Sequence, residues 1–366
     1  MKKAMVILLL FSFVFGTLPA YAEEYYTIRE VREQAAGGWH QRYTAHGREV
    51  TVDIDVVVPD VDSMPVQRVE FARLTPSFTE EETGWRIVCR EEENVFVYET
   101  QVYPEEVSDK IKKVAEGVYA NPNEFDRAYP SGTDLTLGEA IGIARDSFIL
   151  AGLDPDEYLL DRPYELRTFG FYDVKTNEAV LGEYYLSFYQ QLNGIPILCH
   201  SGVAYRERYP LYYNPRLAAI TTGKDAYAIF VDKVKPSATI AEDVPLCAAS
   251  KIIRSIENEI KDGHIRKVYE LELGYILYDD PEYISDTGMT GHYYAVPAWR
   301  LNCLYLSSAK KELPDYEGTD VFERDTTEFA SILINAQSGK MQEYRSDEKG
   351  KGIYQGFISW KDIPKK

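Results

Sequence analysis

The sequence predicts an α+β protein of tandem modules, each a helix packed on an antiparallel sheet, preceded by a mostly-β module. Short segments with the apolar alternation of strands make up most of the chain. Two other segments carry apolar residues at helical spacing, and strand-like segments follow each of them. The second helix-and-strand group repeats residues of the first at one constant offset, which favours a duplication.

Length and composition limit the classes of protein to consider. The chain has 366 residues, of which 45% are hydrophobic and 27% charged, so we expect two or three globular units. Acidic residues outnumber basic ones 59 to 40, giving a net charge of −19. Such a surface repels phosphate, so we expect no nucleic-acid partner and no docking on anionic lipid.

Residues 1–22 have the pattern of a secretory signal peptide. A basic start precedes the apolar run Ala4–Phe15, and Ala20-Tyr21-Ala22 fits the small-x-small cleavage rule. We therefore expect a secreted, extracellular protein cleaved after Ala22, without stable membrane insertion. The alternative is an uncleaved N-terminal membrane anchor, because residues 4–22 approach the roughly 20 residues that span a bilayer.

The expected N-terminal module covers residues 23–130. Residues 51–58 alternate apolar and polar side chains and end at Pro59, as a half-buried strand does. Further strands are expected at 66–74, 85–89 and 95–102, and helices near 26–36 and 105–116.

The first repeat is expected at 131–235. Thr136 and Glu139 form a capping-box pattern, an apolar stripe follows, and Gly152 supplies a left-handed stop. The Asn193-Gly194 pair favours a hairpin turn. The expected strands are 164–172, 183–192, 195–198, 217–222 and 227–234.

The second repeat is expected at 236–346, followed by a tail at 347–366. A helix should reach about Lys261, and strands should follow at 268–278, 293–306, 329–335 and 340–344. Gly291 follows Gly182 by 109 residues, and the same offset aligns further identical pairs. These pairs are Tyr184 with Tyr293, Tyr185 with Tyr294, Leu192 with Leu301, Asn193 with Asn302, and Arg145 with Arg254.

Two strings resemble a known family. Residues 185–197 (YLSFYQQLNGIPI) look like the Q-x-x-N-G-I-P-V strand-turn-strand of PepSY modules, and 295–301 (AVPAWRL) with 332–340 look like segments of PepSY and YycI-like proteins. The resemblance covers roughly residues 135–345. The leading region is similar to uncharacterised exported proteins of Gram-positive gut bacteria. The resemblance implies cystatin-like modules that work outside the cytoplasm without catalysis. Asn335 departs from it, because the motif usually has Asp there.

The candidate partner-binding residues are aromatic. Tyr184, Tyr185 and Tyr189 lie in a segment rich in tyrosine, which suits contact with a peptide or glycan. Trp299 could be an exposed anchor on its strand. For all four residues the alternative is ordinary packing in the core or on a sheet face.

No catalytic, metal-binding or cofactor-binding residues are expected. Cys199 and His200 are strand neighbours, so their side chains point to opposite faces, and acidic clusters such as Asp53, Asp55, Asp60 and Asp62 lack calcium-loop spacing. The other acidic cluster is Asp279, Asp280, Glu282 and Asp286. Cys89, Cys199, Cys247 and Cys303 allow three disulfide pairings or none, and the oligomeric state is open.

These observations lead to one preferred function and two alternatives. The preferred function is a secreted, non-catalytic binding or regulatory protein acting on an extracellular protein or peptide. The first alternative is a cell-wall or glycan-binding protein that uses the tyrosines. The second is a hydrolase with an acidic site that the sequence does not reveal.

Overall fold

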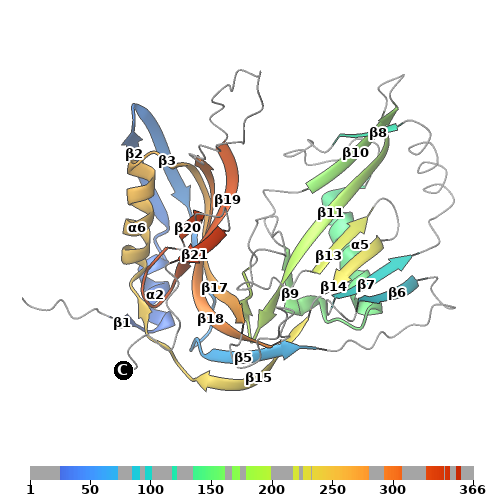
Figure 1. The fold of residues 1–366 in the computed structure, drawn as a ribbon, viewed down its shortest axis with the longest axis horizontal. Coiled ribbons are helices and arrows are strands. Elements are labelled where there is room, and N and C mark those ends of the chain that lie inside the picture. The colour runs from blue at the N-terminus through green and yellow to red at the C-terminus, as the bar shows by residue number, and fades with distance from the viewer. Residues whose placement is uncertain are drawn as a thin grey trace, which may run out of the picture.

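We describe the protein from a computed structural model. It describes residues 25–72, 85–90, 95–100, 118–121, 135–160, 167–173, 179–198, 217–221, 226–231, 233–279, 292–306, 327–341, 343–346 and 352–355. These residues form a mixed α+β fold with many strands and few helices, as the sequence predicts. Figure 1 shows two lobes that meet near the lower ends of their long strands.

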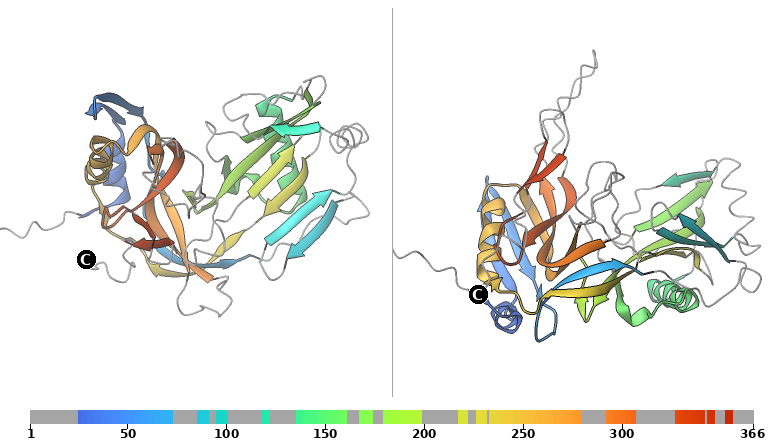
Figure 2. Two further views of the ribbon diagram at one scale, coloured as in Figure 1. Left: turned by 45° about the horizontal axis from the view of Figure 1, so that its top comes forward. Right: turned by 60° about the horizontal axis from the view of Figure 1, so that its bottom comes forward.

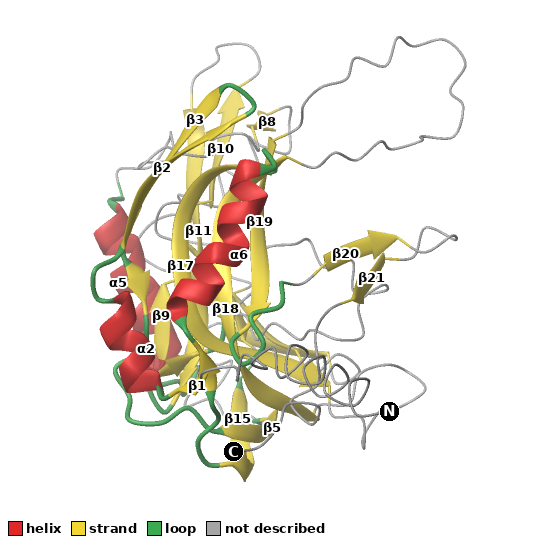
Figure 3. Cartoon of the chain, turned by 90° about the vertical axis from the view of Figure 1, so that its left-hand side faces the viewer, coloured by secondary structure: helices red, strands yellow, loops and turns green. Residues whose placement is uncertain are grey.

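The terminal lobe contains both ends of the described chain, residues 25–72 and 233–355. Its main sheet has the order β15-β5-β18-β17-β4, with β19 also paired to β18. These strands are β15 (Val234–Ala241), β5 (Val66–Phe71), β18 (His292–Leu306), β17 (Ile265–Asp279), β4 (Val56–Val57) and β19 (Thr327–Asn335). The sheet curls strongly, and Figure 3 shows α6 lying across it.

Three small strand pairs complete the terminal lobe. They are the hairpin of β2 (Trp39–Ala45) and β3 (Arg48–Ile54), the pair of β1 (Tyr25–Tyr26) and β16 (Leu246–Cys247), and the pair of β20 (Glu343–Ser346) and β21 (Gly352–Gln355). The β1–β16 pair joins the first described residues to a segment more than 200 positions later. The lobe therefore depends on contacts between distant parts of the chain.

Helices α2 (Ile28–Ala35) and α6 (Ala249–Lys261) pack against each other and against β1, β2 and β17 of this lobe. Thr27 and Glu30 form a capping box that starts α2. Helix α6 begins after Ala248, which offers no capping side chain, and Gln34 of α2 instead accepts a hydrogen bond from the Ala249 N–H. Each helix buries one apolar stripe, as its sequence pattern predicts.

The central lobe, residues 85–231, is built around one antiparallel sheet with the order β6-β7-β14-β13-β11-β10-β8. Its strands are β6 (Trp85–Arg90), β7 (Val95–Thr100), β14 (Ala226–Val231), β13 (Leu217–Thr221), β11 (Ala179–Leu192), β10 (Arg167–Asp173) and β8 (Val118–Asn121). Two short strands, β9 (Tyr158–Leu160) and β12 (Ile195–Pro196), also pair with β11.

Helix α5 (Leu137–Leu150) covers this sheet, contacting β11, β13 and β14. The predicted capping box is present, because Thr136 and Glu139 bond to each other's backbone N–H groups. The predicted stop is also confirmed, since Gly152 follows the helix at a φ of 76°. The short 3-10 helix η2 (Pro155–Glu157) then leads into β9.

The strands of the expected N-terminal module divide between the two lobes. β2, β3, β4 and β5 lie with the C-terminal strands, whereas β6, β7 and β8 join the central sheet. Residues 23–130 therefore do not form one module, because their strand partners lie in different later segments. The expected helix at 105–116 lies outside the described residues.

Strand β15 differs from the prediction, which began the second repeat at Pro236 with a helix that runs to about Lys261. Residues 234–241 instead pair with β5 as the edge of the terminal sheet. An edge strand tolerates proline, because a proline there leaves no ladder hydrogen bond unmade. The pairing register shifts on both sides of Thr239. Such shifts interrupt the alternation of apolar and polar side chains by which a strand is usually predicted from sequence.

Candidate functional site

The junction between the lobes gathers buried polar residues from both of them. Figures 1 and 2 both show strand β11 of the central lobe extending to the terminal lobe. After a turn at Asn193-Gly194, β12 leads to Ile197, which pairs with Tyr275 of β17, and the Leu198 N–H bonds the Tyr275 carbonyl at 2.7 Å. We call residues 192–198 the docking hairpin.

Local sequence explains the shape of the docking hairpin. Asn193 and Gly194 have φ values of 52° and 78°, the left-handed conformation that an Asn-Gly hairpin turn requires. Leu192, Ile195 and Ile197 are buried in the core of the terminal lobe. The predicted turn is confirmed, and its apolar flanks attach the central lobe to the terminal lobe.

Gly274 of β17 allows the docking hairpin to approach closely. A Cβ at this position would lie 2.5 Å from the carbonyl oxygen of Pro196 and 2.8 Å from Cγ of Leu198. A backbone carbonyl cannot move aside as a flexible side chain can. The absence of a side chain at Gly274 is therefore a condition for contact between the hairpin and β17.

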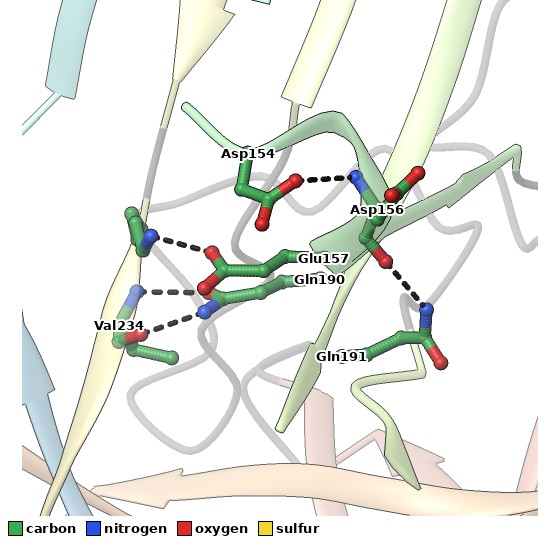
Figure 4. Close-up of polar contacts among 7 residues, drawn as sticks. Asp154, Asp156, Glu157, Gln190, Gln191 and Val234 are labelled. Carbon is green, nitrogen blue, oxygen red and sulfur yellow. Dashed lines mark hydrogen bonds and ion pairs between the residues drawn. The ribbon is translucent and has the colours of Figure 1, made fainter. Parts of the chain in front are cut away.

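Gln190 binds the backbone at the start of β15 with both ends of its amide. Its Nε2 donates to the Val234 carbonyl at 2.7 Å, and its Oε1 accepts from the Val234 N–H at 2.9 Å. Figure 4 shows the two bonds side by side. Both residues are buried, so the side chain satisfies two main-chain groups that water does not reach.

Polar contacts continue outward from this pair. Lys233 donates to Glu157 of η2 at 2.5 Å, while the Gln191 amide donates to the Asp156 carbonyl at 3.3 Å. The side chain of Asp154 caps η2 by accepting from the Asp156 N–H (Figure 4). The half-buried Lys233 contact and the exposed Gln191 contact position η2 beside the junction. The buried Gln190 contact joins β11 of the central lobe to the start of β15.

A second polar cluster lies within the junction. Arg300 of β18 donates to Glu272 of β17 at 2.8 Å, and Tyr189 of β11 donates its hydroxyl to the other carboxylate oxygen at 3.0 Å. The guanidinium of Arg300 also lies 5.4 Å from the centre of the Tyr189 ring. We call Tyr189, Glu272 and Arg300 the junction cluster.

The junction cluster is closed to solvent. Arg300 is 0% and Glu272 is 3% exposed. Burial raises the pKa of Glu272, Arg300 opposes that rise, and nearby Glu270 adds to it. Burial and the Glu272 carboxylate also raise the pKa of Tyr189, so its hydroxyl keeps its proton and donates it.

Further polar groups extend this cluster along the sheet. Glu270 lies 3.6 Å from Arg300 and accepts a bond from Asn302, and Asn302 accepts one from Ser331 of β19. Arg300 is thus held between two carboxylates. These contacts join β11 of the central lobe to β17, β18 and β19 of the terminal lobe. The charged and polar atoms of the group face one another.

Three of the four predicted partner-binding residues lie in the interior. Tyr184 is buried and donates to the Leu135 carbonyl, Tyr189 belongs to the junction cluster, and Trp299 lies in the core of the terminal lobe. The packing alternative therefore holds for these three, because none exposes an aromatic face to a partner. The side chain of Tyr185 lies outside the described residues.

The other described residues that could bind a metal or take part in catalysis do not gather at one site. No group of three His, Cys, Asp or Glu residues within the described ranges is placed to hold a metal ion. His40 pairs with Asp53 across the exposed β2–β3 hairpin, a contact that the sequence analysis missed and that the hairpin register could have indicated. Cys247 and Cys303 are buried, and burial raises the pKa of Cys303 to about 12.

Two further cysteines, Cys89 and Cys199, carry side chains outside the described residues, so their disulfide state stays open. Residues 1–22 also lie outside, so the signal peptide stays a prediction. Among the helices that the structure describes, none is long and apolar enough to cross a membrane.

The fold and the junction define a two-lobed α+β protein whose lobes are joined by a hairpin and a buried polar cluster. A solved structure described as an uncharacterized protein from Eubacterium rectale ATCC 33656 is similar, with a TM-score of 0.51, 12% identity, and coverage of 87% of this chain and 98% of that one. At this identity the similarity concerns the fold alone. No family model and no curated protein matches, so the PepSY resemblance stays a prediction.

Proposed function

We propose that this chain is a secreted, non-catalytic binding or regulatory protein that acts on an extracellular protein or peptide. The observation that carries the proposal is that the ionisable side chains of the junction cluster are buried and bonded to one another. Both carboxylate oxygens of Glu272 are engaged, by Arg300 and by Tyr189, and the group is sealed from solvent. Its geometry serves to join the lobes.

The proposal includes the finer description of each lobe as a cystatin-like module. Support comes from the order of elements after each helix. Helix α5 precedes β10, β11 and β13, which are neighbours in their sheet, and α6 precedes β17, β18 and β19, which are neighbours in theirs. The predicted signal peptide supports the extracellular location.

The test is affinity capture with the mature chain, residues 23–366, from extracellular and membrane fractions of the source cells. A saturable, reproducible protein partner is expected, and thermally unfolded chain serves as the control for non-specific adsorption. Equal recovery on folded and unfolded chain would refute the proposal.

The hydrolase alternative is tested with Glu272→Gln. This variant keeps the size of the side chain and removes its charge, so a catalytic Glu272 would lose its activity. Under our proposal the folded variant binds the captured partner as the parent does. Turnover of a peptide or glycan substrate by the parent chain, abolished in the variant, would favour the hydrolase instead.

A further inference from the structure

Helix α5 exposes large apolar side chains on the side that faces away from its sheet. Ile149 is 55% and Leu150 is 47% exposed, although both belong to a well-formed helix. The opposite side of the same helix buries Ala140, Ala144 and Phe148 in the core of the central lobe. The exposed pair is therefore additional to the stripe that the fold uses.

The corresponding helix of the terminal lobe has a polar outer face. At the offset of 109 residues, Ile149 aligns with Asn258 and Leu150 with Glu259. The outermost residues of α6 are polar throughout, namely Ser250, Arg254, Asn258 and Lys261. A helix in this setting thus accepts polar residues at these positions, so stability does not explain Ile149 and Leu150.

Two positions on the outer face of α5 carry no side chain and lie open among the described residues. A Cβ built on Gly138 or on Gly142 meets no atom within 4 Å. Both glycines lie on the same side of the helix as Ile149, at spacings of eleven and seven residues. A partner segment can therefore lie close to the helix backbone and contact Ile149 at its end.

The charge around this face is one-sided. Residues 135–160 contain five acidic side chains and a single basic one, Arg145. Ion pairs offset two of these acids, because Arg145 pairs with Asp156 at 2.6 Å and Lys233 pairs with Glu157. Asp146 and Glu139, which lie on α5 itself, are exposed. The electrostatic potential at this face therefore favours a positively charged partner.

We propose that the outer face of α5 binds a protein segment that combines apolar side chains with Lys or Arg. The proposal rests on the proposed function and names its surface and the chemistry of its partner. Two copies of this chain would bring the same acidic residues together, so charge disfavours self-association through this face. An anionic lipid surface is disfavoured for the same reason.

The experiment selects binders from a displayed library of random peptides on the immobilised mature chain and measures their affinities by fluorescence anisotropy. Two matched variants are compared with the parent. Ile149→Asn with Leu150→Gln makes the face polar, as it is on α6. Val57→Thr alters another exposed apolar residue, which is 42% exposed and lies in the terminal lobe. Circular dichroism and thermal unfolding verify that both variants fold.

We expect selected peptides to contain Leu, Ile or Phe together with Lys or Arg. Their affinity should fall by about tenfold or more in the double variant, because two apolar contacts are lost. It should stay unchanged in Val57→Thr. Asp146→Asn should weaken binding at low salt and less at high salt, since screening removes its contribution.

Peptides that bind the parent and the double variant equally would overturn this inference and leave the proposed function intact. No peptide retained above unfolded chain would count against the proposed function itself. Sedimentation showing a parent dimer that the double variant converts to monomer would replace the inference with self-association. Retention of glycans alone, on a glycan array, would replace it with the glycan alternative.

Discussion

The two lobes are built in different ways although each combines a helix with an antiparallel sheet. The core of the terminal lobe joins residues from both described ends of the chain, such as Ile28 and Val31 with Ile252 and Trp299. Among the described residues, the buried core of the central lobe lies within residues 140–188. The described core of the terminal lobe therefore joins distant segments, whereas that of the central lobe comes from one stretch of chain, although its sheet also pairs β7 with the distant β14.

The docking hairpin connects these two designs. By sequence it belongs to the central lobe, yet Leu192, Ile195 and Ile197 are buried in the core of the terminal lobe. The central lobe thus contributes apolar side chains to the core of the terminal lobe. We expect the terminal lobe to lose stability when the junction is broken, whereas changes on α5 should affect the central lobe alone.

The largest effect is expected from Arg300→Met at the centre of the junction. The change leaves Glu272 buried without its cation, which costs about 3–5 kcal/mol in comparable cases. The terminal lobe should unfold at a lower denaturant concentration, which the fluorescence of its buried Trp39 and Trp299 measures. Arg42→Met, on an exposed pair with Glu49, is the matched control and should have little effect.

The free energy of unfolding of the Arg300→Met variant should depend more steeply on pH than that of the parent. Burial raises the folded-state pKa of Glu272, so its contribution is present at acidic pH and is lost as the pH rises through that pKa. Removing Arg300 raises this pKa further. The deficit of Arg300→Met relative to the parent should therefore be smallest at acidic pH and grow toward neutral pH. A deficit that shrinks toward neutral pH would contradict the assigned direction.

Local signals explain how much of this architecture the sequence predicts. Helix α5 is predicted from end to end, because its capping box and the Gly152 stop lie within its own segment. The Asn193-Gly194 turn is predicted for the same reason. Strand β15 is missed, because its partner β5 lies far away in sequence and Pro236 is tolerated only at a sheet edge.

The junction was only partly visible in the sequence. Glu272 and Arg300 interrupt apolar runs in LELGYIL and PAWRL, and charged residues in such runs are rarely buried unless they are paired. That signal identifies candidate partners but not their pairing, which β17–β18 register decides by placing Glu272 opposite Arg300. The sequence singles out Tyr189 as one of several tyrosines, but it does not indicate the contact of Tyr189 with Glu272.

The next largest effect is expected from Gln190→Leu. The substitution leaves the N–H and carbonyl of Val234 buried without their partner, and the loss of one such partner costs about 1–3 kcal/mol. Denaturant unfolding of the terminal lobe measures the loss. Gln191→Leu is the matched control, because Gln191 is less buried and makes one longer bond to Asp156. Equal destabilisation by both variants would show that the Val234 contact is not what holds the junction.

Gly274→Ala tests the packing of the docking hairpin against β17. The added Cβ would lie 2.5 Å from the Pro196 carbonyl, so the hairpin must shift away from the strand. Overpacking of this kind costs about 1–3 kcal/mol. Hydrogen exchange should show weaker protection of the Leu198 amide, which bonds to Tyr275 in the parent. Unchanged protection at Leu198 would mean that β17, and not the hairpin, absorbs the strain.

The smallest effect, of opposite sign, is expected from Gly142→Ala on α5. Gly142 lies in the helix interior, and an added Cβ meets no atom within 4 Å. Alanine lowers the entropy of the unfolded chain and should stabilise the central lobe by about 0.5–1 kcal/mol. Thermal unfolding that resolves the two lobes should show the gain in the central lobe only. A matching gain in the terminal lobe would mean that the junction couples the two lobes into one unfolding unit, despite their separate cores.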